Sequence, residues 1–319
     1  MPSIETVIAV VGPTAVGKSS VAEGVAVALG GEIVSADSMQ VYCGLDIGTA
    51  KTPGALRSVP YHCVDLTLPG QPYSAALYQR DARAAIDDII SRSRTPVVVG
   101  GTGLYVRAAL DEMSFPSGDT DGHARRRYET LAQDMGAAAL HDMLQARDPA
   151  SAGLIHPNNV RRVVRALEMA DEGISYAQQA AGFKVRRAVY STLFIGMTMD
   201  RDALYRRIEA RVDAMLDEGL QEEVRVLLAE GYREALTASQ AIGYKELVPV
   251  LEGECRLDEA VALMKQATRR YAKRQLTWFR GDPRIKWLDV TGMSSQEATA
   301  AALELIESSG PIAANAADE

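Results

Sequence analysis

The residues GPTAVGKS at positions 12–19 decide the fold of this chain. They match the phosphate-binding pattern G-x-x-x-x-G-K-[ST], and they stand between the apolar run Val7–Val11 and a helical run from Ser20 to Leu29. This strand–loop–helix setting is the one in which the pattern binds phosphate, because glycines let backbone amides curl around phosphate oxygens at a positive helix N-terminus. The stretch therefore predicts a phosphate site, without saying whether the phosphates belong to a nucleotide.

Two side chains of this loop carry the expected chemistry. Lys18 supplies a full positive charge, and the Ser19 hydroxyl can ligate a Mg²⁺ ion that bridges phosphate oxygens. We expect every residue of the loop to contribute to diphosphate or nucleotide binding, that is, Gly12, Pro13, Thr14, Ala15, Val16, Gly17, Lys18 and Ser19.

The bulk composition excludes several classes of protein. With 319 residues and 47% hydrophobic content, the chain can form one large domain or two modest ones. Its three cysteines have no metal-ligand spacing and suit a reducing cytoplasm better than a disulfide framework. The sequence has no apolar run of about 18 residues and no basic segment before the first strand. We therefore expect a cytoplasmic protein without a membrane span or signal peptide.

Basic residues gather in three clusters, although the formal net charge of the chain is −8. Residues 265–286 hold eight Lys and Arg against a single acid, a second cluster spans 161–187, and a third is Arg125–Arg127. Each cluster is typical of a solvated helix face, and each is equally compatible with a local groove for nucleic acid. The net charge argues only against nucleic-acid binding over the whole surface.

The order of elements predicts an α/β fold with an insertion. Residues 1–112 alternate between apolar strands and helices, which is typical of a doubly wound parallel sheet of the P-loop NTPase kind, with ligands at the carboxyl ends of the strands. Residues 114–122 read as a loop, residues 123–180 are helical throughout, and residues 188–197 read as a strand that returns to the sheet. We assign 1–112 and 198–319 to a discontinuous core with C-terminal helices, and 113–197 to a mainly helical insertion domain.

Three further features narrow the chemistry. Asp37 follows the second predicted strand and can act as a general base or hold Mg²⁺, although a helix N-cap would use the same residue type. The apolar strand at 97–99 ends in Gly-Gly-Thr-Gly without the acid that a hydrolytic NTPase places there, which favours group transfer and leaves Thr102 to bind a substrate. The segment GLDIGTAK at 44–51 predicts a structured loop near an anionic ligand.

Taken together, the motifs resemble the tRNA dimethylallyltransferase family, also called tRNA isopentenyltransferases. The similarity runs in order over nearly the whole chain, and its blocks are GPTAVGKS (12–19), SADSMQVY (35–42), GLDIGTAK (44–51), GGTGLY (100–105), HPNNVRRVVRALE (156–168), LYRRIEARVDAML (204–216), QAIGYKE (240–246) and KRQLTWFR (273–280). The phosphate loop is shared by many families, whereas the joint occurrence of the other blocks is specific.

The resemblance implies a reaction. A dimethylallyl group would move from dimethylallyl diphosphate to N6 of the adenosine immediately 3′ of the anticodon, in tRNAs that read codons starting with U. Lys18, Ser19 and Mg²⁺ would neutralise the charge that grows on the departing diphosphate, and Thr14 would face it as well. Asp37 would accept the proton of the attacking amine. One of Arg207 and Arg211 would reach the diphosphate, although helix salt bridges would explain this pair equally well.

The same resemblance implies contacts with the tRNA anticodon stem-loop. The helical insertion and the core would grip it, with the target base flipped out of its stack. The matching positions are Asp37, Ser38, Met39, Gln40, Thr102, Arg125, Arg161, Arg162, Val163, Val164, Arg165, Gln240, Gly243, Lys245, Lys273, Arg274 and Arg280. Such a protein would work as a monomer, without a membrane or an obligate protein partner.

Some positions depart from the family pattern, and rival functions remain open at this stage. Ser19 stands where Thr is common, and Cys43 stands where a basic residue is usual, so one anionic contact would be missing. A small-molecule kinase would share the phosphate loop and the acid after the second strand, but it would have no reason for the basic clusters. A GTPase-like RNA-binding module would need an Asn-Lys-x-Asp signal, which the sequence lacks.

Overall fold

The computed structural model describes residues 6–116, 122–235 and 237–310, and they form two compact units. The first unit combines Met1–Leu110 with Ala188–Glu319, and the second comprises Asp111–Arg187. The first unit is an α/β structure and the second is helical. Each is described by itself below.

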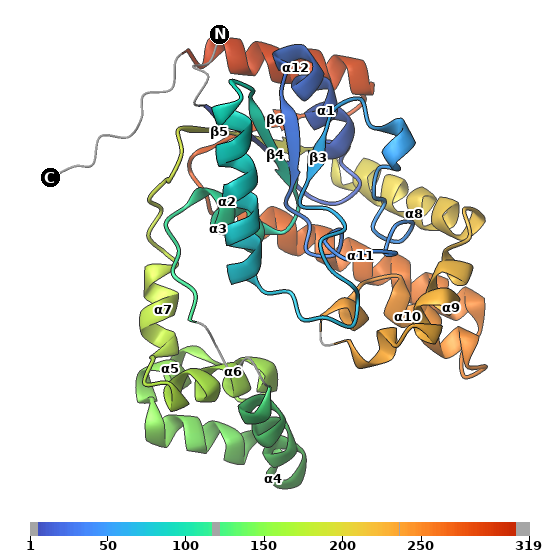
Figure 1. Ribbon diagram of the computed structural model, residues 1–319. Helices are drawn as coiled ribbons and strands as arrows, with labels where there is room; N and C mark the ends of the chain where they lie inside the picture. The colour runs from blue at the N-terminus through green and yellow to red at the C-terminus, as the bar shows by residue number, and fades with distance from the viewer. Residues whose placement is uncertain (1–5, 117–121, 236, 311–319) are drawn as a thin grey trace, which may run out of the picture. The chain divides into compact units, whose positions relative to one another are not determined.

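A six-stranded parallel sheet organises the first unit, with the strand order β3-β2-β4-β1-β5-β6 (Figure 1). Its strands are β1 (Val7–Val11), β2 (Glu32–Ser35), β3 (Tyr61–His62), β4 (Pro96–Gly100), β5 (Thr192–Thr198) and β6 (Ile285–Asp289). Strand β1 lies between β4 and β5. Strands β2, β3 and β4 lie on one side of it, and β5 and β6 lie on the other. This reversal of strand order is where doubly wound sheets bind ligands, just beyond the carboxyl ends of the strands.

Continuous apolar runs explain why these strands are central. All five residues of β1 are buried, because helices cover both faces of the sheet. Ile8 and Val10 point to the face on which α1 (Lys18–Leu29) and α12 (Ser295–Ser308) pack. The other face is covered by α2 (Ala75–Ser91) and α3 (Gly103–Leu110) (Figure 1).

The C-terminal half of the first unit is mainly helical. It contains α8 (Arg201–Asp217), α9 (Leu220–Ala229), α10 (Tyr244–Leu251) and α11 (Leu257–Arg280), besides short 3₁₀ turns at Tyr232–Glu234 and Ala238–Gln240. Helix α8 carries Leu204 and Ile208 into the main core, and α11 carries Ala272 into it. Helices α8 and α11 therefore pack against the main core through the sides that carry these residues.

The second unit consists of α4 (His123–Arg147), α5 (Pro149–Leu154), α6 (Val160–Asp171) and α7 (Tyr176–Gly182). Helices α5, α6 and α7 begin at polar caps, since Asp148, Asn159 and Ser175 each accept a hydrogen bond from a backbone amide of the following helix. Leu140 and Leu144 of α4 pack with buried residues of α6 to form a separate core. The glycine at 136, with φ of +85°, bends α4.

The sequence predicts most of these elements correctly. The strands expected near residues 6–11, 32–35, 97–99, 188–197 and 285–288 are all present, and the helical character of 123–180 is confirmed. The two-residue edge strand β3 was not predicted. The second unit ends at Arg187, because the strand that follows pairs with β1 and so belongs to the first unit rather than to the insertion, which the sequence extended to 197. Part of the expected loop at 114–122, namely 117–121, lies outside the described residues.

Among the residues that the structure describes, no helix combines the length and the apolar character that crossing a membrane would need.

Candidate functional site

The phosphate loop joins β1 to α1 and is shaped by two glycines. Gly12 has a φ of +147°, and a Cβ there would stand 2.5 Å from the carbonyl oxygen of Met197 on β5, so no larger residue fits. Gly17 has a φ of +102° and is the cap of α1, where glycine has no side chain to block the helix amides. The N-terminus of α1 is therefore accessible to an anion, as the sequence predicts.

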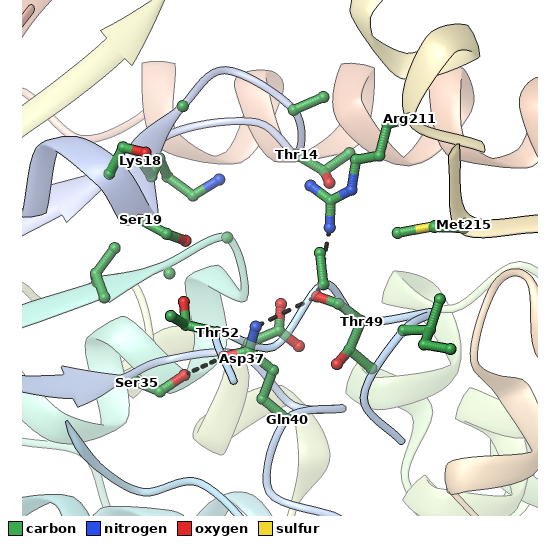
Figure 2. A pocket seen from close by; sticks show the side chains of 18 of the residues that line it. Thr14, Lys18, Ser19, Ser35, Asp37, Gln40, Thr49, Thr52, Arg211 and Met215 are labelled. Carbon is green, nitrogen blue, oxygen red and sulfur yellow. Dashed lines mark hydrogen bonds between the residues drawn. The ribbon is translucent and has the colours of Figure 1, made fainter. Parts of the chain in front are cut away.

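A pocket of about 360 Å³ opens beside this loop. It is lined by Thr14, Ala15, Gly17, Lys18 and Ser19 of the loop, by the residues after β2 and β4, and by side chains of α8 and α11. Figure 2 shows the ammonium of Lys18, the guanidinium of Arg211 and the carboxylate of Asp37 facing the same space. The predicted catalytic residues Thr14, Lys18, Ser19 and Asp37 thus line one cavity. The buried Val16 and Pro13 support the loop from behind.

Lys18 is held toward the pocket by its own loop. Its Nζ donates a hydrogen bond to the carbonyl oxygen of Pro13 at 2.6 Å. Loss of water around the ammonium and the nearby charge of Arg211 lower the pKa of Lys18 to about 7, against a smaller opposing effect of Asp37. An anion bound in the pocket would favour the charged form of Lys18, so the side chain is suited to bind one.

Both arginines between which the sequence could not choose line the pocket. Arg211 Nη2 donates to the carbonyl oxygen of Thr49 at 3.3 Å, and burial lowers the pKa of its guanidinium from the ordinary value. Arg207 approaches the phosphate loop, since its Nη2 lies 3.6 Å from where a Cβ on Gly17 would stand. Helix α8 therefore adds positive charge opposite the loop from two successive turns.

The carboxylate of Asp37 takes part in a turn and also lines the pocket. Its Oδ1 accepts a hydrogen bond from the amide of Met39 at 2.9 Å, as a turn or cap residue does. The same carboxylate faces into the pocket (Figure 2). The turn therefore fixes the carboxylate in place without removing it from the site, which leaves the other oxygen to accept a proton.

The segment 37–40 is positioned from two sides. Thr102 Oγ1 accepts from the amide of Ser38 at 3.1 Å, and its hydroxyl donates to Ser38 Oγ at 3.3 Å. Gln40 Oε1 accepts from Ser35 Oγ at 2.9 Å, and its Nε2 donates to the carbonyl oxygen of Thr49 at 3.3 Å. Thr102, which the sequence predicts as a substrate contact, is thus placed beside the predicted segment 37–40 and orders it.

Gln275 of α11 is a positioning residue that sequence reasoning missed. Its Oε1 accepts from the amide of Thr14 at 2.8 Å, and its Nε2 donates to the carbonyl oxygen of Gly101 at 2.9 Å. The side chain is buried and joins the phosphate loop to the end of β4. The sequence signal that could have identified Gln275 is a polar residue on the inward side of an amphipathic helix.

Tyr271, one turn earlier, also lines the pocket, and burial together with the charge of Asp37 raises the pKa of its phenol to about 12.

The loop 44–51 lines the opposite wall through Ile47, Thr49 and Ala50. The carboxylate of Glu223 on α9 holds it, accepting from the amides of Ile47 at 2.8 Å and Gly48 at 3.2 Å. The expectation of a structured loop is confirmed. Its lysine, however, is not available to bind a ligand, because Lys51 is buried and forms ion pairs with Asp46 and Asp65, each at 2.5 Å.

Cys43 stands where the family pattern has a basic residue. Its thiol donates to the carbonyl oxygen of Asp65 at 3.4 Å. The side chain is partly buried and is not among the pocket-lining residues.

The predicted tRNA contacts of the first unit differ in exposure, and those of segment 37–40 and Thr102 are partly buried. Gln240, Lys245, Lys273, Arg274 and Arg280 all lie on the surface of this unit. Gly243 is an exception, because it is buried at the start of α10 and its amide donates to Glu246 Oε2 at 2.8 Å. Its φ of +99° explains the glycine, and its contact with tRNA stays a prediction.

The predicted contacts of the second unit divide in the same way. Arg161 and Arg162 are exposed on α6, whereas Arg125 and Arg165 both form ion pairs with the buried Glu168, at 2.9 and 3.2 Å. Val163 and Val164 are buried in the helical core, so their side chains pack inside this unit, and their contact with tRNA stays a prediction. They face inward because α6 is amphipathic, and a block of matching sequence includes both of its faces.

No group of three or more His, Cys, Asp or Glu able to hold a metal occurs among the described residues. The oxygen donors that line the pocket include the Ser19 hydroxyl and the carboxylates of Asp37 and Glu218. Such a sparse set fits Mg²⁺, which takes few protein ligands and is bound largely through substrate phosphates and water.

Comparisons with known proteins agree with this geometry. A family model described as IPP transferase matches residues 40–282. The chain belongs to this family. It is 50% identical over 289 residues to the tRNA dimethylallyltransferase of Geobacillus thermodenitrificans, covering 90% of this chain and 91% of the relative. The enzyme of the same name from Carboxydothermus hydrogenoformans is 49% identical over 297 residues, covering 92% and 94%.

Solved structures of the family share the fold. A tRNA isopentenylpyrophosphate transferase from Bacillus halodurans is 42% identical with a TM-score of 0.69, covering 95% of this chain and 96% of the other. A eukaryotic dimethylallyltransferase acting on tRNA is 30% identical with a TM-score of 0.77, covering 97% and 81%. The P-loop-like α/β fold expected from the sequence is therefore confirmed.

Proposed function

We propose that this protein transfers a dimethylallyl group from dimethylallyl diphosphate to N6 of the adenosine 3′ of the anticodon, in tRNAs that read codons starting with U. The observation that carries the proposal is the single pocket that holds the phosphate loop, two arginines and Asp37 in a chain of the IPP transferase family. The products would be N6-isopentenyladenosine and diphosphate.

The phosphate loop would hold the leaving group. Lys18 and the amides of α1 would bind the diphosphate, with Thr14 beside them and with Arg207 and Arg211 of α8 lining the same pocket. As the allylic C–O bond breaks, negative charge grows on the diphosphate, and these fixed positive groups stabilise it more than they stabilise the bound donor. Gln275 serves this step by fixing the position of Thr14.

A divalent cation belongs to the chemistry of this family, and Mg²⁺ fits the donors present. Ser19 Oγ would hold it together with diphosphate oxygens, and it would supply further neutralisation of the leaving group. Ser19 lies at the first turn of α1, where a hydroxyl can reach an ion bound by phosphate.

Asp37 would act as the general base. While the exocyclic nitrogen attacks the allylic carbon, a C–N bond forms, and the amine proton passes to the free oxygen of the carboxylate. The turn through Met39 keeps that carboxylate aimed into the pocket, and Thr102 and Ser38 hold the backbone beside it. No residue needs to activate water, which agrees with β4 ending in glycines.

The tRNA would be bound by exposed basic residues of both units. Arg161 and Arg162 on α6, and Lys273, Arg274 and Arg280 on α11, are predicted contacts whose side chains are exposed and could bind phosphates. Arg125 and Arg165 would orient α6 through Glu168 or exchange this partner for the nucleic acid. The target base would be flipped out of its stack, because its amine cannot otherwise reach an enclosed donor. A cytoplasmic monomer suits this substrate.

The test is transfer of radiolabel from dimethylallyl diphosphate to unmodified tRNA, with Mg²⁺ and without ATP. Label at the adenosine beside the anticodon supports the proposal. Absence of transfer, combined with phosphate transfer from ATP to a small molecule, would favour a kinase and contradict it.

A further inference from the structure

The side of α8 that lines the pocket changes the sign of its charge along the helix. Its pocket-lining residues recur every three or four positions and so share one face, and they are Arg207, Arg211, Ala214, Met215 and Glu218. Arg207 lies beside Gly17 of the phosphate loop. Glu218 follows eleven residues later, about 16 Å away at the rise of an α-helix. This wall of the pocket therefore begins with two cations near the phosphate loop and ends with a carboxylate.

Glu218 stands at the rim of the pocket, since it is exposed to solvent and also lines the cavity. Within the parts of the chain that the structure describes, its carboxylate takes part in no hydrogen bond or ion pair. It caps the C-terminal end of α8, where a negative charge opposes the helix dipole. The charge of Glu218 therefore does not stabilise the helix, and it is left to act on the pocket.

Arg211 is the cation on which this charge acts. Loss of water lowers the pKa of its guanidinium, and the negative charges of Asp37 and Glu218 oppose that shift. Figure 2 shows the guanidinium of Arg211 reaching toward Thr49, whose carbonyl oxygen it contacts. An anion bound near Arg211 would be attracted by the guanidinium and repelled by Glu218.

The departing diphosphate makes such a repulsion useful. When the allylic C–O bond breaks, its electron pair stays on the diphosphate, which therefore leaves with one more negative charge than it had as an ester. The cations that stabilise this charge in the transition state also bind the product more tightly than the donor. A fixed negative charge at the rim opposes the more highly charged product most.

We propose that Glu218 offsets the charges of Arg207 and Arg211, so that the pocket binds diphosphate weakly enough for the product to leave. This inference rests on the proposed function, because it concerns the leaving group of that reaction. Glu218 acts through its charge and has no contact with the reacting atoms. Its removal should therefore change the affinity for diphosphate without removing a catalytic group.

The experiment is titration calorimetry with inorganic diphosphate and Mg²⁺, in the absence of tRNA and of a prenyl donor. Glu218→Gln removes the charge and keeps the size of the side chain, and we expect it to bind diphosphate about three- to tenfold more tightly. In about 1 M salt, where the screening length is about 3 Å, this gain should vanish.

Asp217→Asn is the matched control. It removes the same charge one residue earlier, from a side chain that is exposed but is not among the pocket-lining residues. Its dissociation constant for diphosphate should equal that of the unaltered protein. Tighter binding by both variants to the same extent would mean that only the net charge of the protein matters, and would overturn the inference.

Kinetics and stability give readouts that a merely structural role would not move in this way. Diphosphate should inhibit transfer by Glu218→Gln at correspondingly lower concentrations, whereas single-turnover transfer should be no slower, because every cation of the pocket remains. The melting temperature of the variant should not fall. An unchanged affinity for diphosphate would overturn the inference. If diphosphate binds as expected but no tRNA is modified, the proposed function fails, while the calorimetry still decides the role of Glu218.

Discussion

The phosphate loop 12–19 and the loop 44–51 have similar compositions and opposite roles. Each contains two glycines, a threonine and a lysine, and both line the same pocket. Lys18 donates to a carbonyl oxygen of its own loop and faces the cavity. Lys51 is 4% exposed and lies between two carboxylates, with a further hydrogen bond to the carbonyl oxygen of Tyr42.

The difference shows what makes a lysine available to a ligand. The loop 44–51 carries its own counterion, Asp46, five residues before the lysine, whereas the phosphate loop contains no acid. A lysine paired in this way holds its loop together, whereas a lysine without a carboxylate partner is available to an anion, whose binding favours the charged form. We therefore expect substitutions of Lys18 and of Lys51 to have different consequences.

The largest effect should come from Asp37, which faces Lys18 across the pocket. Asp37→Ala should lower turnover by about 10²–10⁴-fold, because a general base contributes that much, with little change in tRNA affinity. Single-turnover transfer and filter binding measure the two quantities. Asp37→Asn is the matched control, since its amide oxygen can still accept from Met39. We expect it to fold normally and to be equally slow. Loss of tRNA binding with normal turnover of bound tRNA would show that Asp37 is not the base.

Lys18→Ala should reduce turnover by about 10²–10³-fold, the range for removing one group that stabilises developing charge. Its free energy of unfolding should not fall, because burial already disfavours the charged side chain in the absence of ligand. Steady-state transfer and urea denaturation test the pair of expectations. A variant that unfolds readily and transfers normally would show that Lys18, like Lys51, stabilises its loop and does not act in the reaction.

The pH dependence of diphosphate binding follows from the lowered pKa of Lys18. Between the folded value of about 7 and the ordinary 10.5, the unfolded chain binds a proton that the folded chain lacks, so the unliganded protein gains stability as pH rises through this window. Diphosphate reverses the preference, and binding above pH 7 should take up close to one proton.

Calorimetry in buffers of different ionisation enthalpy measures this uptake. Lys18→Arg is the control, because a guanidinium stays charged throughout the range and should show no such uptake. Equal uptake by the variant and the unaltered protein would assign the proton to another group.

Lys51→Met should have the reverse effects of Lys18→Ala. Removing the ammonium leaves the carbonyl oxygen of Tyr42 and two partly exposed carboxylates without their partner, which should cost about 1–3 kcal/mol of stability. Turnover per folded molecule should stay within a few-fold of normal. Thermal unfolding and transfer by the folded fraction are the measurements. A stable variant with no activity would assign Lys51 to the reaction.

The smallest effect concerns the basic surface outside both loops. Arg162→Ala should weaken tRNA binding several-fold and reduce the slope of log K against log salt by about 0.7–0.9, the contribution of one phosphate contact. Lys286→Ala removes an exposed charge that belongs to no predicted contact and should leave the slope unchanged. A normal slope for Arg162→Ala would exclude this residue from the tRNA contacts.

Local patterns were enough to predict the sheet and the phosphate loop. Continuous apolar runs mark the buried strands, and the spacing of glycines with Lys18 defines the loop, because both depend on neighbours within a few residues. The edge strand β3 was missed since two residues carry no periodic signal. Met215 falls at helical spacing with core residues and is easily assigned to the core, whereas the structure places it on the pocket wall.

The missed site residues depend on contacts between distant parts of the chain. Gln275 reaches Thr14, and Glu223 reaches Ile47, across separations that no local pattern encodes. Val163, Val164 and Gly243 are buried, so the matching blocks of sequence also include residues that support a surface without being exposed on it. A motif therefore locates a site, and burial decides which of its residues can touch a ligand.

The most direct test is the stoichiometry of the reaction with dimethylallyl diphosphate, tRNA and Mg²⁺ in the absence of ATP. Mass spectrometry of digested tRNA counts isopentenyladenosine, and an enzymatic assay counts released diphosphate. The account predicts one intact diphosphate for each modified adenosine, because the phosphate loop holds a leaving group and activates no water. A requirement for ATP, or release of single phosphates without modified adenosine, would contradict it.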